Sequence, residues 1–416
     1  MSRSVRRRVW AMGACGACLL TSIAVLHAQD WNQWRGPSRT GVAAAFTPPA
    51  QWPDRPTRAW QLKVGEGHSS PVVSGPRAFV LARWGDEDVV TAVDVQSGKQ
   101  VWQQRYAAPY QVNPAAASHG KGPKSTPVVS GGRLFTLGVN GTLSAFDAAT
   151  GKVVWRKQFA KEFDAATPDF GAAMSPVVDN GLLIVHAGGN KTGALMALDA
   201  VTGAPKWQWT GGSPAYASPI VATIGTTRQV ITQSRSHVVG VNAATGALLW
   251  QIPFTTAYDQ NVVTPVIAGN VLIYSGLDKP LAAVRLLSKA GKWTPEPLWQ
   301  NDALPMFMSS PVVSGQRVFG LTHKNKGQFF CADLATGKAL WTTRGREGEN
   351  AALIVAGGLL LATTTEAELV VARIDSGKFD VVKRYTVADS PIWAHPVPVE
   401  KGVLIKDAET LSYWTF

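Results

Sequence analysis

Six regularly spaced copies of a three-residue motif, Ser or Thr followed by Pro and then Val or Ile, lie along this chain of 416 residues. The prolines lie 43 to 56 residues apart, at Pro71, Pro127, Pro176, Pro219, Pro265 and Pro311. A second motif follows most copies. It is Asp or Asn, two residues, Thr or Ser and Gly, with Trp four residues after the glycine, as in Asp94–Trp102 and Asp147–Trp155. A unit of this length cannot bury its own apolar face, so the units must pack against one another.

Each unit has room for four short strands separated by turn signals. In the second unit we expect strands at 127–129, 133–139, 142–145 and 153–159. Asn140-Gly141 is a strong hairpin signal because both positions must accept positive φ. In the Asp-x-x-Thr-Gly turn the Asp side chain accepts backbone N–H groups, and the glycine takes the left-handed conformation. Four-stranded units of this size are typical of a β-propeller.

The number of units predicts an all-β, eight-bladed propeller of antiparallel blades. Six units are clear, and Ala351–Val387 keeps Ser376-Gly377-Lys378 although it lacks the Pro and Trp. A last unit begins at His395 and ends at Phe416, with length for three strands only. Arg58–Val64 supplies the fourth strand, so the N- and C-terminal strands close the ring together and leave no free edge. Seven blades is the alternative if 351–387 is not a blade.

The repeated polar and aromatic residues are best interpreted as architecture. A hydroxyl at the same place in six blades is expected to form a hydrogen bond near the axis. The tryptophan that ends each repeat is expected to cover the neighbouring sheet, where it buries a large apolar area. We therefore assign no nucleophile to the repeated serines and threonines.

Residues 1–28 resemble a secretory signal peptide. Arg3, Arg6, Arg7 and Arg8 precede an apolar stretch from Val9 to Leu26, and cleavage is expected after Ala28. A membrane anchor is the alternative, but glycines and hydroxyl residues make this stretch a poor span. The signal predicts a periplasmic or secreted protein with no transmembrane segment after its removal. An extended segment, 29–57, then leads into the propeller, 58–416.

Cysteine content and charge limit the remaining classes. Two of the three cysteines lie in the signal, so Cys331 alone remains and no intramolecular disulfide can form. Loss of the four signal arginines takes the formal net charge from +12 to +8. No Lys/Arg-rich run occurs in the mature chain, which argues against nucleic-acid binding. The sequence does not indicate the oligomeric state.

Catalytic and metal-binding motifs are absent from the sequence. Outside the expected signal segment, which contains Cys15 and Cys18, no His-x₃-His or Cys-x₂-Cys spacing occurs, and no nucleophile elbow or Walker loop is present. Asp86-Glu87-Asp88 resembles a weak calcium site, but three adjacent acids in a hairpin loop are more often solvated, and the spaced ligands of a calcium loop are missing. We therefore predict no catalytic, cofactor-binding or metal-binding residue.

One end of the axis is the best candidate for binding. The first strand of each blade lines the axis, so the residues just before each Ser/Thr-Pro crowd one opening. We predict a binding surface there, formed by His68, His119, Lys124, Tyr216, Trp393 and His395. Met174, Asn261 and Met308 precede inner strands in the same way. A mixture of aromatic, Met and basic side chains suits an adaptable binding surface.

The repeated element Ala-x-Asp-x-x-Thr/Ser-Gly-Lys-x-x-Trp resembles the repeat of the pyrroloquinoline-quinone (PQQ)-like propeller family. Ala92–Trp102 and Ala145–Trp155 match it best. The opening Trp31-Asn-Gln-Trp34-Arg-Gly-Pro also looks like the start of many exported members. The resemblance covers nearly the whole mature chain and is specific for the fold more than for an activity.

The family resemblance implies two classes of function. Quinoprotein dehydrogenases hold PQQ and calcium at the top of the propeller, whereas BamB-type members bind proteins. Many of the dehydrogenases carry a vicinal disulfide and long blade insertions, and this chain has neither. We therefore predict a non-catalytic exported scaffold that binds a protein or envelope component and needs no cofactor. The alternatives are a PQQ- and calcium-dependent alcohol or sugar dehydrogenase and a carbohydrate- or small-molecule-binding protein.

Overall fold

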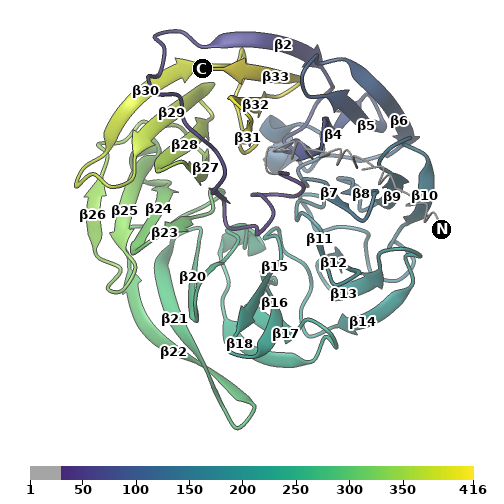
Figure 1. The fold of residues 1–416 in the computed structure, drawn as a ribbon. Helices are drawn as coiled ribbons and strands as arrows, with labels where there is room; N and C mark the ends of the chain where they lie inside the picture. The colour runs from purple at the N-terminus through teal and green to yellow at the C-terminus, as the bar shows by residue number, and fades with distance from the viewer. Residues whose placement is uncertain (1–29) are drawn as a thin grey trace, which may run out of the picture.

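The computed structural model of this protein describes residues 30–416, which form a ring of β-sheets around a central axis (Figure 1). The predicted signal peptide, residues 1–28, lies outside the described residues. Each of the eight blades is an antiparallel sheet of four strands, so the predicted all-β, eight-bladed propeller is confirmed and the seven-bladed alternative is wrong.

The blades follow one another in chain order, each with its first-listed strand innermost. The strands of blades 1 to 4 are β3 (Val72–Ser74), β4 (Arg77–Trp84), β5 (Glu87–Asp94), β6 (Gln100–Ala107); β7 (Val128–Ser130), β8 (Arg133–Leu137), β9 (Leu143–Asp147), β10 (Val153–Lys157); β11 (Val177–Asp179), β12 (Leu182–Gly188), β13 (Gly193–Asp199), β14 (Pro205–Trp209); β15 (Ile220–Ile224), β16 (Thr227–Gln233), β17 (His237–Asn242), β18 (Leu248–Pro253). The strands of blades 5 to 8 are β19 (Val266–Ala268), β20 (Val271–Gly276), β21 (Lys279–Lys289), β22 (Lys292–Asn301); β23 (Val312–Ser314), β24 (Arg317–Thr322), β25 (Gln328–Asp333), β26 (Ala339–Thr342); β27 (Ala351–Ala356), β28 (Leu359–Thr364), β29 (Glu368–Arg373), β30 (Asp380–Thr386); β31 (Val397–Val399), β32 (Gly402–Lys406), β33 (Thr410–Thr415), β2 (Thr57–Lys63).

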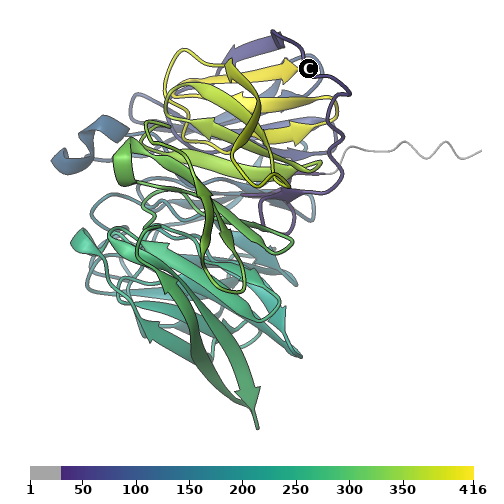
Figure 2. The same ribbon diagram turned by 90° about the vertical axis from the view of Figure 1, so that its left-hand side faces the viewer.

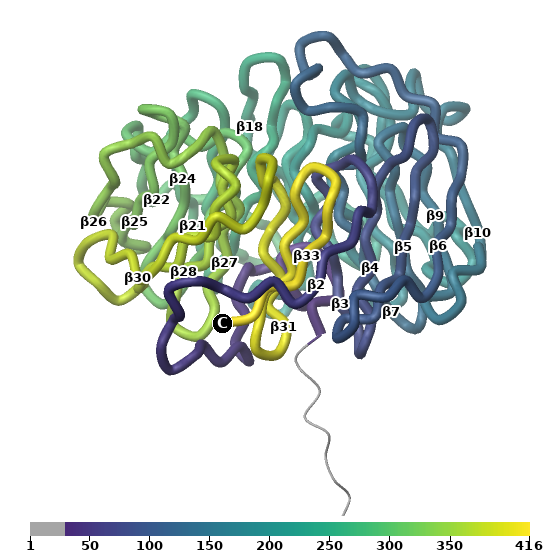
Figure 3. Tube along the Cα trace, turned by 90° about the horizontal axis from the view of Figure 1, so that it is seen from above, coloured from purple at the N-terminus to yellow at the C-terminus, as the bar shows by residue number. Residues whose placement is uncertain are grey.

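The ring closes through blade 8, as predicted. Strand β2 pairs antiparallel with β33, and Figure 3 shows the two strands side by side. A buried lysine strengthens this closure. The three N–H groups of the Lys406 ammonium are shared among four backbone carbonyls, those of Gly65 and Gly67 after β2 and of Asp407 and Ala408 after β32. The cation thereby satisfies acceptors from both ends of the chain.

The repeated tryptophans join neighbouring blades. Trp102 lies over Gly151 of the next blade, where an added Cβ would meet the indole at 2.6 Å, and its Nε1 donates to the Ala148 carbonyl. Trp60 packs in the same way on Gly98. Each such turn therefore requires glycine for two reasons: the backbone has a positive φ, and the indole occupies the space that a Cβ would need. Blade 7 lacks the regular turn, and there Trp341 packs on Phe379 instead.

The repeated hydroxyls form a chain of hydrogen bonds around the axis. The backbone N–H of Ser70 donates to the Thr126 hydroxyl, that of Thr126 to Ser175, and that of Ser175 to Ser218. The chain continues through Thr264 to Ser310, and His395 N–H donates to Ser70. The predicted hydrogen-bonding role of these residues is therefore confirmed, and the chain of bonds is interrupted at blades 7 and 8, which have no hydroxyl at this position.

Residues 30–56 pack on the propeller and cross one end of its axis (Figures 1 and 2). The carbonyls of Trp31 and Asn32 accept hydrogen bonds from the inner strands of blades 1 and 2. Farther along, β1 (Val42–Ala43) pairs parallel with β27 of blade 7. We call this end, crossed by residues 30–43, the closed end, and the opposite end the mouth.

Candidate functional site

The six predicted binding residues lie on a single cavity at the mouth. His68, His119, Lys124, Tyr216, Trp393 and His395 all line this axial cavity, whose volume is about 340 Å³. They come together because each belongs to a connection that leads into an inner strand. Met308 lines the cavity too. Met174 and Asn261 do not, because Met174 lies in the core between blades and Asn261 bonds to backbone carbonyls of blade 4.

The longest connection, between β6 and β7, builds one wall. It contains the 3₁₀ helix η1 (Pro114–His119), which stands on the mouth side in Figure 2 and begins where the Asn113 side chain accepts from Ala115 N–H. At its end, the His119 carbonyl lies 3.0 Å from Nε2 of His68. The His119 and Trp393 rings meet edge to face with centroids 4.8 Å apart. Two imidazoles and an indole thus form an aromatic wall.

The adjoining part of the wall combines aromatic groups with one cation. Phe170 and Tyr216 pack with ring centroids 5.8 Å apart, and the Tyr216 hydroxyl accepts from the Phe170 backbone N–H. Lys124 reaches the Phe170 carbonyl at 3.4 Å, which is a long contact for an ammonium. Burial lowers the pKa of Lys124 to about 8. The ammonium is therefore partly desolvated and weakly paired.

The floor is a tryptophan from the N-terminal segment, which sequence analysis missed as a site residue. Trp34 lines the cavity and meets His395 edge to face at 5.4 Å. The guanidinium groups of Arg35 and Arg39 lie over its ring at 5.3 and 5.4 Å. Both arginines are buried, and they donate to carbonyls such as those of Pro311 and Ser175. Burial lowers the pKa of each to about 9, with Arg35 adding repulsion at Arg39.

Burial keeps the imidazoles of the cavity neutral. It lowers the pKa of His68 to about 3, helped by repulsion from Lys124, and that of His395 to about 3, helped by Arg35. Nδ1 of His68 and Nε2 of His395 are buried without a hydrogen-bond partner. Such nitrogens are costly unless a ligand or water meets them. With the imidazoles neutral, the positive charge around the cavity comes from Lys124, Arg35 and Arg39. Two imidazole nitrogens of the cavity lack a hydrogen-bond partner.

A second hollow extends the mouth outward over blades 6 and 7. It has a volume of about 630 Å³ and shares His119, Phe307, Met308 and Trp393 with the axial cavity. Its outer part is lined by charged residues of both signs, including Arg346 and Glu349. The blade that departs most from the repeat thus borders the continuation of the cavity.

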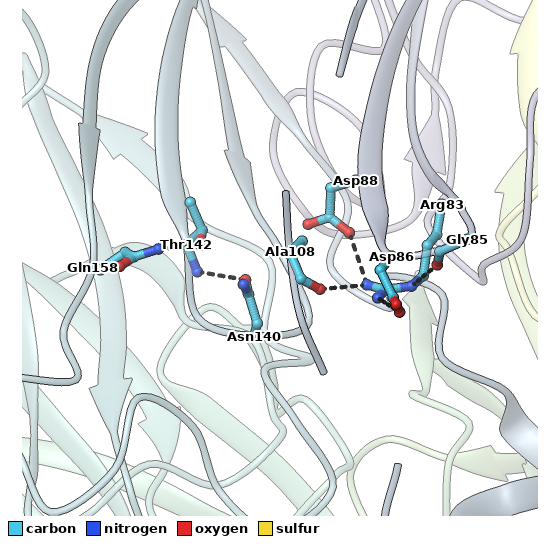
Figure 4. Close-up of polar contacts among 8 residues, drawn as sticks. All are labelled: Arg83, Gly85, Asp86, Asp88, Ala108, Asn140, Thr142 and Gln158. Carbon is cyan, nitrogen blue, oxygen red and sulfur yellow. Dashed lines mark hydrogen bonds and ion pairs between the residues drawn. The ribbon is translucent and has the colours of Figure 1, made fainter. Parts of the chain in front are cut away.

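The acidic triplet after Trp84 is only partly the solvated loop that the sequence predicts, since Asp86 and Glu87 are exposed and Asp88 is not. Asp86 is exposed, but Asp88 is fully buried, with Oδ1 3.6 Å from Nη1 of Arg83 (Figure 4). Arg83 also donates to the Gly85 and Ala108 carbonyls. Burial raises the pKa of Asp88 to about 7 against the opposing effect of Arg83. The expectation of solvation is therefore wrong for Asp88, because its strand pairs it directly with Arg83.

The donor set of the cavity does not fit calcium. Calcium prefers six to eight oxygen ligands that include carboxylates, and no Asp or Glu lines the axial cavity. Within residues 30–416 no group of three or more His, Cys, Asp or Glu side chains is placed to hold a metal ion. In the same part of the chain no helix is long and apolar enough to span a membrane.

Fold and repeat together define the class of this protein as a PQQ-like, eight-bladed propeller. The family model described as "Outer membrane protein assembly factor BamB" matches residues 86–343 and, in an overlapping match, 286–392. The chain therefore belongs to that family.

Individual relatives come from both functional classes. The chain is 25% identical to the outer membrane protein assembly factor BamB of Yersinia pestis over 371 residues, which is 84% of this chain and 86% of the relative. The BamB structure from Moraxella catarrhalis aligns with a TM-score of 0.62 at 15% identity, covering 87% of this chain and 98% of that one. A quinohemoprotein alcohol dehydrogenase from Comamonas testosteroni aligns with a TM-score of 0.68 at 15% identity, covering 93% and 80%. The structural likenesses bear on the fold alone.

Proposed function

We propose that this protein is an exported, non-catalytic propeller scaffold that binds another protein or an envelope component through its mouth. The observation that carries the proposal is that the residues which hold the ring together differ from those which line the mouth. Repeated hydroxyls and tryptophans serve the ring, whereas the mouth gathers His119, Phe307 and Trp393 from connections that differ between blades. The outward hollow continues the cavity, which suits an extended segment of a partner.

Membership of the BamB family supports this proposal, because the family is described as that of an outer membrane protein assembly factor. The predicted signal peptide supports export to the periplasm or beyond. Cleavage after Ala28 is tested by N-terminal sequencing of the protein recovered from its native host.

Retention of a partner from an envelope extract tests the scaffold function. The bait is the full mature protein, compared with the mouth variants Phe307→Ala and Trp393→Ala. Leu248→Ala, an exposed apolar residue of outer strand β18, is the matched control. We expect a protein that the wild type and L248A retain and both mouth variants lose. Equal retention by all four baits, or no retained protein, contradicts the proposal.

The second candidate function is PQQ-dependent oxidation of an alcohol or sugar. The fold similarity to a quinohemoprotein alcohol dehydrogenase favours it, and the absence of carboxylates from the cavity lining argues against a calcium-bound quinone. A ligand that binds only the folded state raises the melting temperature. We expect no rise with saturating PQQ and CaCl₂; a rise accompanied by dye-linked oxidation of alcohols would establish the enzyme instead.

A further inference from the structure

The axial cavity offers hydrogen-bond donors in excess of acceptors. Six hydroxyls line it, each at the start of an inner strand: Ser70, Thr126, Ser175, Ser218, Thr264 and Ser310. Each accepts a backbone N–H from another blade. A hydroxyl carries one proton of its own to donate, and within residues 30–416 none of the six has a protein acceptor for that proton. The six hydroxyl groups can therefore donate hydrogen bonds to a ligand in the cavity.

The charged side chains that line this space or lie behind its floor are all positive. Lys124 lines the cavity with only a long contact to a carbonyl, and Arg35 and Arg39 lie behind the Trp34 floor. Nε and Nη1 of Arg35 and Nε of Arg39 are buried without partners. Of the residues lining the axial cavity none is acidic; Glu349 belongs to the outer hollow, and Asp169 lies beside the lining residue Phe170 and acts on Tyr216. Besides burial, Lys124 lowers the pKa of His68 and Arg35 lowers that of His395, which agrees with this excess of positive charge.

The upper part of the same cavity is apolar and aromatic. Phe170, Val262, Phe307, Met308 and Trp393 line it above the hydroxyl ring. A volume of about 340 Å³ lies within the usual range for small-molecule sites. The cavity therefore suits a ligand with an acceptor-only, negatively charged head and an apolar body.

We propose that the axial cavity binds a small organic acid, with its carboxylate among the hydroxyl ring and Lys124 and its apolar body between the aromatic walls of the mouth. A carboxylate is acceptor-only when ionised and takes several donors at once. One lining ammonium matches one negative charge. This binding site goes beyond the proposed scaffold function, since it needs no protein partner.

Calorimetric titration with 3-phenylpropanoate and its neutral amide, 3-phenylpropanamide, tests the proposal. We expect the acid to bind about tenfold or more tightly than the amide, as loss of a charge-assisted hydrogen bond predicts. Its affinity should fall as salt is added. Equal affinities for the two compounds, or no binding of either, would overturn the proposal.

Variants of two lysines in one connection locate the site. Lys124→Met should weaken binding of 3-phenylpropanoate about tenfold, whereas Lys121→Met, on the exposed side of the same connection, should leave it within about twofold. Lys124→Gln provides a second, polar substitution if K124M does not fold. Folding of each variant is checked by its melting temperature. Unchanged affinity in a folded Lys124 variant, or equal losses in the Lys121 variant, contradicts the assignment.

Discussion

The two ends of the propeller axis are built from different parts of the same repeat. At the closed end, residues 30–43 join several blades through backbone hydrogen bonds, and the regular turns pack against tryptophans of neighbouring blades. At the mouth, the connections differ in length and sequence, and their side chains surround a cavity. The ring of hydroxyls contributes to both ends, since its oxygens accept hydrogen bonds from backbone N–H groups of neighbouring blades and also line the cavity.

This difference teaches where a repeated sequence leaves room for function. A residue that recurs in most blades is explained by contacts that recur in most blades, such as Trp102 on Gly151. A residue that occurs once, such as Trp393, has no such explanation and lies at the mouth. Blade 7 extends the comparison, because it lacks the repeated contacts and borders the outer hollow.

The largest expected effect comes from filling the space under a docked indole. Gly151 has φ +75°, and a Cβ there would lie 2.6 Å from Trp102, so Gly151→Ala should lower the free energy of unfolding by about 3 kcal/mol. Gly377 of blade 7 has no atom within 4 Å of an added Cβ, so Gly377→Ala should change it by less than about 0.5 kcal/mol. Urea unfolding measures both. Similar losses in the two variants would show that blade 7 is docked like the others.

A smaller effect is expected from the hydroxyl ring. Ser218→Ala removes the acceptor of the buried Ser175 N–H, which should cost about 1–2 kcal/mol of unfolding free energy. Ser125 is also buried beside an inner strand, but its hydroxyl has no partner, so Ser125→Ala should have little effect. The two variants are compared by urea unfolding. A neutral S218A would mean that the ring does not stabilise the fold.

The last prediction concerns the pH dependence of stability at the mouth side of blade 1. The folded-state pKa of Asp88, about 7, lies above its ordinary value of 3.8, so the folded protein binds this proton more tightly than the unfolded chain. The contribution of Asp88 to stability is therefore complete below about pH 4 and is lost as the pH rises through 7.

Replacement of Asp88 by Asn isolates this contribution. The unfolding free energy of D88N relative to wild type should rise between pH 4 and 8 and stay level below pH 4. Unfolding curves of both proteins at several pH values provide the difference. A relative stability of D88N that instead falls over this range would mean that Arg83 keeps the carboxylate ionised in the folded protein.

Sequence analysis predicted the fold because the repeat fixes spacing, strand number and docking at once. It also placed Arg58–Val64 in the last blade, since the final unit is one strand short. The parallel pairing of β1 with β27 had no signal, because two residues outside the repeat carry no periodicity. Their position depends on backbone contacts across the axis.

The site was only partly predictable. Residues such as His68 and Tyr216 were found because their place before an inner strand fixes their position at the mouth. Trp34 was missed because nothing in the repeat relates the N-terminal segment to the axis. The buried Asp88 had an overlooked signal, since the hairpin sets it directly opposite Arg83 and such a pair of charges can be buried together.

The central claim, that one end of the axis is sealed by the chain itself and the other is open, is tested most directly by hydrogen–deuterium exchange of the wild-type protein. The N–H groups of Val73, Val129 and Val355 donate to carbonyls of residues 31, 32 and 41. Within the segment, the N–H groups of Gly36, Arg39 and Gly41 are bonded too, so these strands and segment 30–43 should be protected together. We predict that peptides from 30–43 exchange as slowly as the blade cores and that peptides from 107–120 at the mouth exchange much faster. Segment 30–43 exchanging as fast as the mouth connection would contradict the account.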